Sequence, residues 1–353
     1  MTYRVGVIGC GRMAGTIDDE IDWRHPDFLL PYGHAGGYAA VRATELVAAA
    51  DIDAGRLASW CDRFGVTARY ADYREMIRRE SLDIVSVTTH ATGRAAPILF
   101  AAEAGVPGIY AEKALCVSAA ELDAICATGA RCGTHLVYGA MRRYWAGFET
   151  ARSCIDSGSL GERRGVVLGA TGGAAFHTHS HFIDAALYLL GDPEPVAVRA
   201  SLRGRDGQPL VVGEDPVAGL VIDADPGIDF AVVELAGGLR LTCAPLPYSE
   251  IEVVCAEGIV RSWGDSAGYA ARRQRERYVW EEVPFPTWKA RSGTVALIED
   301  LVHSLETGEA GRSSADTARR GMEILFGMVV SHHRGGTRVE LPLADRRVRV
   351  DSR

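Results

Sequence analysis

The stretch of residues 4–15 constrains the fold of this chain more than any other part of the sequence. The apolar run from Val5 to Ile8 suits a strand buried on both faces, and Gly9, Gly11 and Ala14 follow it with the spacing G-x-G-x-x-A. Gly9 allows a tight turn, Gly11 lets the backbone approach a pyrophosphate, and Ala14 allows a helix to pack closely on the strand. This pattern directly after a strand predicts dinucleotide binding.

The turn after this strand is expected to bind the phosphates of the dinucleotide. The first N–H groups of a helix that starts there have no partner within the helix, and they form an anion site. The residues of the turn that we expect at the cofactor are Gly9, Cys10, Gly11, Arg12 and Met13. A lone glycine pattern also occurs in ordinary strand-to-helix turns, so the prediction depends on the strand before it.

Length and composition limit the classes of protein to consider. The 353 residues suffice for two domains of roughly 100–200 residues each. A formal net charge of −8 argues against a nucleic-acid partner, because neutralising phosphates needs clustered Lys and Arg. The eight cysteines include no C-x-x-C pair, and no stretch approaches the run of about 18 apolar residues typical of a membrane helix. We therefore expect a cytoplasmic protein with reduced, mostly buried thiols and no membrane partner.

Residues 16–37 interrupt the first predicted helix. Pro26, Pro31 and a cluster of glycines cannot continue one regular helix. We interpret this segment as an insertion, after which the helix resumes near residues 35–43. One interpretation is a solvated surface loop, and the other is a flap over the cofactor or substrate, or a subunit contact.

An acidic residue, Asp51, follows the second predicted strand, Thr44–Ala50. A carboxylate at this position accepts hydrogen bonds from the ribose hydroxyls of NAD and repels the 2′-phosphate of NADP, so NAD is the expected cofactor. The separation from Gly9 is longer than usual because the insertion lies between them. Asp53 is the nearby competitor, but its place before an apolar helical pattern favours a role as N-cap of the next helix.

Strands alternate with helices as far as residue 140. The expected strands are 83–89, 106–111 and 134–140, and the expected helices are 73–79, 95–104 and 118–130. This alternation predicts an α/β fold that begins with a Rossmann domain over residues 1–142, built on a doubly wound parallel sheet. The carboxyl ends of such strands share one edge of the sheet, where ligands bind.

The pattern changes after residue 142. The expected helices are 146–157, 295–306 and 314–330. Short strands broken by Gly and Pro begin at 165–170 and continue over 196–260, which predicts a mainly antiparallel sheet. The charged end, 345–353, is most simply a tail. We therefore expect a second, α+β domain with an open sheet over residues 143–353.

Two places carry side chains suited to catalysis. Lys113 follows the strand predicted over 106–111, where an amine can donate to a substrate oxygen, although a lysine at a strand end is most often a solvated charge. In the second place, a helix that begins near Ser180 puts His181 and Asp184 on one face. A histidine beside a carboxylate is the usual arrangement for a general base near neutral pH.

His177, His179 and His181 also suggest a metal site, since three imidazoles can bind zinc. The pattern H-x-H-x-H alone does not fix a coordination geometry. We therefore expect no metal here.

Together these motifs resemble the glucose-fructose oxidoreductase and inositol dehydrogenase family (Gfo/Idh/MocA), over nearly the whole chain. Besides the glycine turn, the motifs that carry the resemblance are Thr88-Thr89, Ala111-Glu112-Lys113 in place of E-K-P, Arg143-Tyr144, Ser157-Gly158-x-x-Gly161-Glu162, His181-x-x-Asp184 and Leu189-Leu190-Gly191. Each motif is weak alone, and their order and spacing make the resemblance specific.

The resemblance implies hydride transfer between NAD(P) and a secondary hydroxyl or keto group of a sugar, cyclitol or related polyol, without a metal. It also implies that the open sheet of the second domain forms a homodimer or homotetramer. By position, Lys113 would bind or protonate the reacting oxygen, His181 would be the acid/base, and Asp184 would orient His181 or a substrate hydroxyl. Other residues implied at the cofactor or the substrate are Thr89, Glu112, Arg143, Tyr144 and His177, and Lys113 is implied at both.

Three positions depart from the family pattern. Ala114 replaces the proline after the lysine, His177 replaces an Asp four residues before the histidine, and His90 replaces a proline after the threonines. His177 would bind substrate, share in proton transfer or alter the chemistry. The departures leave two alternatives: a redox-neutral epimerase, glycosidase or eliminase that uses bound NAD transiently, and a nucleotide-binding protein without catalysis.

Overall fold

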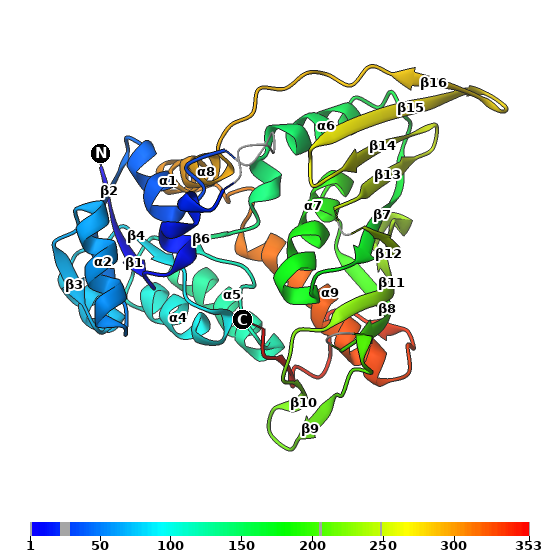
Figure 1. Ribbon diagram of the computed structural model, residues 1–353. Coiled ribbons are helices and arrows are strands. Elements are labelled where there is room, and N and C mark those ends of the chain that lie inside the picture. The colour runs from blue at the N-terminus through cyan, green and yellow to red at the C-terminus, as the bar shows by residue number, and fades with distance from the viewer. Residues whose placement is uncertain (1, 22–28, 205–206, 248, 353) are drawn as a thin grey trace. The chain divides into compact units, whose positions relative to one another are not determined.

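The chain folds into two compact units, which the computed structural model describes over residues 2–21, 29–204, 207–247 and 249–352 (Figure 1). The first unit comprises Met1–Cys116, Glu121–Tyr144 and Arg291–Ala318. The second comprises Val117–Ala120, Trp145–Ala290 and Arg319–Arg353. Each unit has its own sheet.

The first unit is built on a six-stranded parallel sheet with the strand order β3-β2-β1-β4-β5-β6. Its strands are β1 (Tyr3–Ile8), β2 (Thr44–Ala50), β3 (Ala68–Tyr70), β4 (Ile84–Val87), β5 (Gly108–Ala111) and β6 (His135–Tyr138). Strands β4 and β5 are buried throughout, as expected for apolar runs covered on both faces. The order reverses between β1 and β4, which is the Rossmann arrangement, so the predicted doubly wound parallel sheet is confirmed.

Helices cover both faces of this sheet. They are α1 (His34–Ala40), α2 (Ala54–Phe64), α3 (Tyr73–Arg79), α4 (Ala95–Glu103), α5 (Ala119–Cys132) and α8 (Gly293–Thr307). As predicted, Asp53 is the N-cap of α2, where its carboxylate accepts the N–H of Arg56 at 2.9 Å.

Helix α8 completes the core of the first unit although it comes late in the sequence. Its Leu297 and Leu301 are fully buried in one apolar cluster with Val5, Ile84 and Tyr110 of the sheet. Our expected second domain, 143–353, included this helix, because an apolar stripe shows that a helix is packed but not which sheet it covers.

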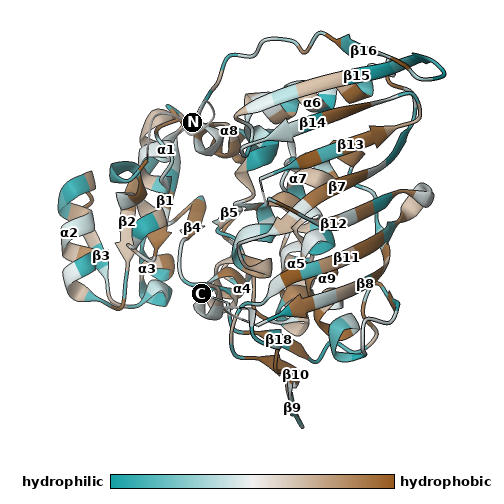
Figure 2. Cartoon of the chain, turned by 45° about the vertical axis from the view of Figure 1, so that its right-hand side comes forward, coloured by the Kyte–Doolittle hydropathy of each residue, from teal (hydrophilic) through white to brown (hydrophobic). Residues whose placement is uncertain are grey.

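The second unit holds a nine-stranded sheet with the order β16-β15-β14-β13-β7-β12-β11-β8-β17. Its strands are β7 (Arg163–Thr171), β8 (Pro195–Arg203), β11 (Gly227–Leu235), β12 (Arg240–Pro247), β13 (Ile251–Cys255), β14 (Gly258–Trp263), β15 (Gly268–Glu276), β16 (Val279–Val283) and β17 (Val339–Glu340). Every neighbouring pair is antiparallel except β7 and β12, which confirms the predicted mainly antiparallel sheet. Figure 2 shows apolar and polar residues alternating along these strands.

Helices α6 (Ala146–Asp156), α7 (Ser180–Leu190) and α9 (Ala315–His333) pack on one face of this sheet (Figure 1). On α9, Ser331 accepts the backbone N–H of Ala200 in β8 at 2.9 Å. The alternation along the strands leaves Phe230, Leu246 and Trp263 exposed on the other face.

The charged C-terminal end is more than the tail we predicted. Residues Val348–Val350 form β18, which pairs with β10 (Gly219–Ile222) in a small sheet that also contains β9 (Gly213–Asp215). Val348 and Val350 are buried. A three-residue strand is too short for its alternation to stand out among arginines and aspartates.

The insertion is described except for residues 22–28, which lie outside the described residues. Two short 3₁₀ helices, Arg12–Ala14 and Thr16–Asp19, replace the regular helix predicted directly after the glycine turn, which corrects that prediction. The helix α1 begins at His34, close to the predicted restart. The carboxylate of Asp18 accepts the backbone N–H groups of Tyr32 (2.9 Å) and Gly33 (2.6 Å), and so joins the two ends of the insertion.

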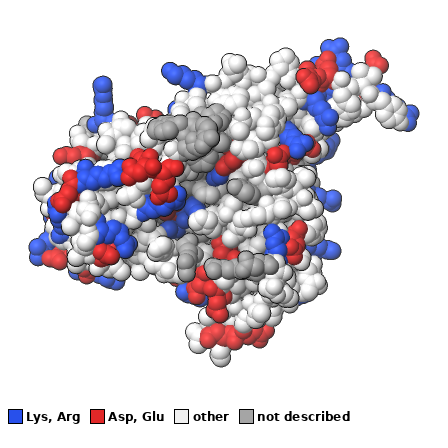
Figure 3. Space-filling model, in the orientation of Figure 1, with Lys and Arg blue, Asp and Glu red and all other residues white. Residues whose placement is uncertain are grey.

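The structure gives the state of the cysteines and the distribution of charged side chains on the surface. All eight cysteines are free, and the buried ones are Cys10, Cys61, Cys116, Cys243 and Cys255. Figure 3 shows acidic and basic side chains interspersed on the face it displays. Within the described part of the chain, none of the helices has the length and apolar character needed to cross a membrane.

We expect Leu301→Ala to lower the free energy of unfolding by about 2–5 kcal/mol, because it leaves a cavity between α8 and the parallel sheet. Chemical denaturation measures this change. The control Glu299→Ala alters an exposed position of the same helix and should stay within about 0.5 kcal/mol of the wild type. Equal effects of the two substitutions would contradict the packing of α8 described above.

Candidate active site

The glycine turn follows β1 at the point where the strand order reverses. Gly9 has φ +89°, and a Cβ there would lie 3.1 Å from the backbone nitrogen of Thr89, so the turn requires glycine. Its N–H donates to the carbonyl of Ala50 at 2.8 Å, and the Thr88 hydroxyl donates to its carbonyl. A Cβ built on Gly11 meets no described atom within 4 Å. This open side of Gly11 is what the close approach of a pyrophosphate needs.

The carboxylate of Asp51 lies against this turn at the end of β2. Its Oδ2 accepts the N–H of Cys10 at 2.7 Å, and its Oδ1 accepts the N–H of Asp53 at 2.8 Å. Nη1 of Arg56 is 3.8 Å from Oδ2. Burial and the neighbouring Asp51 carboxylate raise the pKa of the Cys10 thiol, which stays neutral. The turn and the carboxylate beside it fit a dinucleotide cofactor.

The two other residues of the turn are more accessible. Arg12 is exposed, and its Nε donates to a carboxylate oxygen of Glu20 at 2.7 Å. Met13 is half-buried. Both remain predicted contacts of the cofactor.

Lys113 follows β5 at the same sheet edge and is half-buried. The side chain of its neighbour Glu112 is buried; Oε2 accepts the N–H of Lys113 at 3.2 Å, and Oε1 lies 3.1 Å from Nε2 of His34. Burial by itself would raise the pKa of Glu112, but the hydrogen bond from His34 and the charges of His34, Lys113 and Arg94 hold it below its usual value. Glu112 is therefore a buried carboxylate anion beside the lysine. The peptide bond between Lys113 and Ala114 is cis.

A buried arginine joins the loops that follow β4 and β5. The guanidinium of Arg94 donates to the carbonyls of Thr89 and Ala114. The Thr89 hydroxyl donates to the carbonyl of Gly93 at 3.2 Å. The structure thus brings the glycine turn, Asp51, Thr89, Glu112 and Lys113 to one edge of the parallel sheet.

Arg143 and Tyr144 also belong to the first unit, and both are fully buried. The Tyr144 hydroxyl donates to Oδ2 of Asp300 at 2.8 Å and accepts the N–H of Ser313 at 3.1 Å. Nη1 of Arg143 is 3.4 Å from the carbonyl of Arg312, to which it donates. These contacts tie the end of the Rossmann region to residues 291–318, and substrate binding by either residue stays a prediction.

His181 and Asp184 lie in the second unit, in the first turn of α7. The helix begins at Ser180, as predicted, so the two residues are three positions apart on one face. Asp184 is buried and His181 is half-buried. The apolar residues Ile183, Leu187 and Leu190 of this helix are buried.

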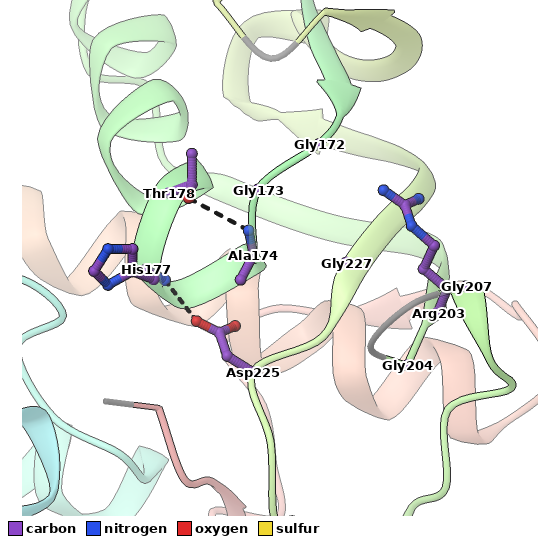
Figure 4. A pocket seen from close by; sticks show the side chains of 10 residues that line it. All are labelled: Gly172, Gly173, Ala174, His177, Thr178, Arg203, Gly204, Gly207, Asp225 and Gly227. Atoms are coloured by element: carbon purple, nitrogen blue, oxygen red, sulfur yellow. Dashed lines mark hydrogen bonds between the residues drawn. The ribbon is translucent and has the colours of Figure 1, made fainter.

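A single turn of π-helix, Ala175–His179, precedes α7. Asp225 caps it, since its two carboxylate oxygens accept the N–H groups of Phe176 (2.9 Å) and His177 (2.7 Å). Figure 4 shows the bond to His177. The side chain of His177 is exposed, whereas His179 is fully buried and its Nε2 lies 3.0 Å from the carbonyl of Gly172. Among the described residues there is no group of three His, Cys, Asp or Glu side chains that could hold a metal ion.

A cavity of about 540 Å³ opens beside this turn (Figure 4). It is lined by Gly172, Gly173, Ala174, His177, Thr178, Arg203, Gly204, Gly207, Asp225 and Gly227. Exposed glycine backbone, a hydroxyl, an imidazole and two opposite charges suit a ligand rich in hydroxyl groups.

Sequence reasoning missed three polar residues of these sites. His34 contacts Glu112 across 78 positions, Arg94 contacts Ala114 across 20, and Asp225 contacts His177 across 48. No local pattern marks such pairs, because each partner becomes a neighbour only through the sheet topology.

The strand order, the glycine turn and Asp51 define a dinucleotide-binding Rossmann unit. Residues 3–139 match the model of the oxidoreductase family with an NAD-binding Rossmann fold, Gfo/Idh/MocA. This part of the chain belongs to that family, as its motifs predicted.

Similar proteins extend the match beyond the Rossmann region. The chain is 29% identical over 164 residues to inositol 2-dehydrogenase of Salmonella typhimurium, which covers 46% of this chain and 44% of that protein. The matched part of the chain thus spans less than half the length of this relative. D-apiose dehydrogenase of Paraburkholderia graminis is 24% identical over 335 residues, 87% of this chain and 86% of its own.

Among solved structures, the aldose-aldose oxidoreductase from Caulobacter crescentus superposes with a TM-score of 0.73 at 21% identity. The superposition covers 97% of this chain and 100% of that one. At this level of identity the likeness shows the fold.

The buried His179 predicts a pH dependence of stability. Burial lowers its pKa from 6.5 to about 4 in the folded chain, so between these pH values the unfolded chain binds a proton that the folded chain does not. This histidine should therefore remove about 3 kcal/mol from the free energy of unfolding as the pH falls from 6.5 to 4. Urea unfolding of the wild type and His179→Gln should give a difference that shrinks over this range. A constant difference would contradict the prediction, and exposed His303→Gln serves as the control.

Proposed function

We propose that this protein is an NAD-dependent oxidoreductase that transfers hydride between the nicotinamide and a secondary hydroxyl or keto group of a sugar, cyclitol or related polyol. Family membership of residues 3–139 and relatives named as inositol and apiose dehydrogenases support it. The observation that carries the proposal is Lys113 at the ligand edge of the parallel sheet, beside the buried Glu112 carboxylate.

The lysine content of the chain strengthens this choice. Lys113 and Lys289 are the two lysines among 38 Lys and Arg residues, so basic positions elsewhere are filled almost always by arginine. An ammonium differs from a guanidinium because it is a compact charge that can give up a proton. A lysine kept at the ligand edge therefore favours chemistry at Lys113 over a general need for positive charge.

In the proposed reaction Lys113 and His181 have different roles at one substrate oxygen atom. Lys113 donates a hydrogen bond to this oxygen and stabilises the negative charge that develops on it. His181 accepts the hydroxyl proton in oxidation and returns it in reduction, and Asp184 orients the imidazole. When bound, NAD supplies the acceptor or donor of the hydride.

Two further assignments complete the proposal. Gly9, Cys10, Gly11, Arg12, Met13, Asp51, Thr89 and Glu112 would hold the cofactor, and His177, Arg143 and Tyr144 would bind the substrate. The cavity beside His177 has the size and polar lining of a small-molecule site, which supports a polyol there.

The exposed apolar face with Phe230, Leu246 and Trp263 supports a homodimer or homotetramer formed through the open sheet.

Lys113→Met and His181→Asn should each lower kcat by about 10²–10⁴-fold, because each removes a group that acts on the reacting oxygen. The dissociation constant of NAD should stay within about twofold, since neither change touches the glycine turn. NADH absorbance during turnover with a panel of polyols and amino sugars measures kcat, and fluorescence titration measures NAD binding. Lys289→Met removes the exposed lysine and is the matched control. Near-normal turnover of Lys113→Met or His181→Asn would refute the assignment.

Asp51→Asn should weaken NAD and lessen the preference for NAD over NADP by about tenfold, because the repulsion of a 2′-phosphate disappears. The asparagine keeps an oxygen that can accept the N–H of Cys10. Asp53→Asn changes the exposed cap of α2 and should leave the preference unchanged. Titration of each variant with both cofactors tests this, and an unaltered preference in Asp51→Asn would show that another group selects the cofactor.

A further inference from the structure

A buried polar group lies behind Lys113 in the first unit. It consists of His34 at the start of α1, Ser86 on β4 and Glu112 directly after β5. Nδ1 of His34 lies 2.6 Å from the Ser86 hydroxyl, and its Nε2 lies 3.1 Å from Oε1 of Glu112. The three side chains are at most 3% exposed, so water does not substitute for these bonds.

The imidazole of His34 is held in one orientation. Both ring nitrogens have partners, and the ring stacks on Tyr110 with centroids 3.8 Å apart and planes 16° from parallel. A ring fixed by two hydrogen bonds and a stack presents Nε2 to Glu112 at a defined place.

Glu112 connects the fixed imidazole of His34 to the backbone of Lys113. One carboxylate oxygen pairs with His34, and the other accepts the backbone N–H of Lys113. On the far side, the Arg94 guanidinium donates to the carbonyl of Ala114. The backbone on both sides of Lys113 is therefore fixed by charge-assisted hydrogen bonds.

His34 lies near the C-terminal end of the insertion, residues 16–37. His34 follows Tyr32 and Gly33, whose N–H groups are bound by Asp18 from the other end of the insertion. The hydroxyls of Ser292 and Thr294, at the start of α8, donate to the carbonyls of Pro31 and Tyr32. The segment before His34 is thus anchored to two other parts of the unit.

We propose that His34 is a positioning residue, which acts through Glu112 to hold Lys113 in the place where it binds the reacting oxygen. This inference rests on the proposed role of Lys113. His34 pairs with the carboxylate of Glu112, which in turn accepts the backbone N–H of Lys113, so the loss of His34 displaces the ammonium without removing it.

Two substitutions of His34 separate its two bonds. A glutamine amide reaches about as far as Nε2 and keeps a donor for Glu112, whereas an asparagine amide reaches about as far as Nδ1 and keeps the bond to Ser86 only. His34→Asn should lower kcat about 10–100-fold, the scale of a displacement of about 1 Å at a catalytic group, with an unchanged dissociation constant of NAD. His34→Gln should recover most of the rate.

Thr44→Val is the matched control for damage to the same helix. The Thr44 hydroxyl donates to the carbonyls of Tyr38 (2.7 Å) and Val41 (3.0 Å) at the C-terminal end of α1. This variant should lower Tm and leave kcat within about twofold. If His34→Asn does not fold, Ser86→Ala tests the same route through the orientation of the ring, because it removes the Nδ1 partner that holds Nε2 toward Glu112.

The scarcity of lysine allows a direct readout of Lys113. In a Lys289→Arg background, protein labelled with ¹³Cε-lysine gives one lysine signal in an NMR spectrum, that of Lys113. His34→Asn should shift or broaden this signal, His34→Gln should largely restore it, and Thr44→Val should leave it unchanged.

A double substitution distinguishes the two proposals. If His34 acts through Lys113, adding His34→Asn to Lys113→Met lowers kcat no further. Additive losses, or normal kcat and an unmoved lysine signal in His34→Asn or Ser86→Ala, would overturn the positioning role while Lys113 stays catalytic. Normal turnover of Lys113→Met alone would overturn the proposed function, and this inference with it.

Discussion

The ligand edge of the first unit depends on one buried carboxylate, Glu112. An ionised carboxylate removed from water is strongly destabilising unless hydrogen bonds and opposite charges compensate it. Its hydrogen-bond partners are His34 from α1 and the backbone of Lys113, and the charge of Arg94, from the loop after β4, also acts on it. The hydrogen bonds and charges that compensate the Glu112 carboxylate therefore hold three separate segments together. The fold can bury this carboxylate because these segments are arranged around it.

Features that depend on neighbours in sequence were predicted well. The glycine turn, Asp51 at the end of β2, the Asp53 cap and the start of α7 at Ser180 each follow from a few adjacent residues. Features that depend on distant contacts were not predicted, such as the pairing of His34 with Glu112 and the packing of α8 on the parallel sheet. Both require the strand order, which local periodicity does not contain.

The three alternating histidines lie in different environments. Residues two apart in a helical turn of about 3.6 residues point to nearly opposite sides. The π-helix and α7 accordingly leave His177 exposed, bury His179 against the carbonyl of Gly172, and leave His181 half-buried. The spacing that suggests shared metal ligands thus distributes the imidazoles among different environments.

Arginine and lysine have separate tasks in this chain. Arg94 is buried and anchors two backbone carbonyls, and Arg63 pairs with both carboxylate oxygens of Asp19, as a rigid fork of donors can. Such static contacts do not need a group that changes its protonation. Lys113 lies between Glu112 and Ala114, where the buried side chains of Glu112 and Arg94 hold the backbone. A compact ammonium at such a prepared position is more consistent with proton and charge transfer at a substrate oxygen than with structure alone.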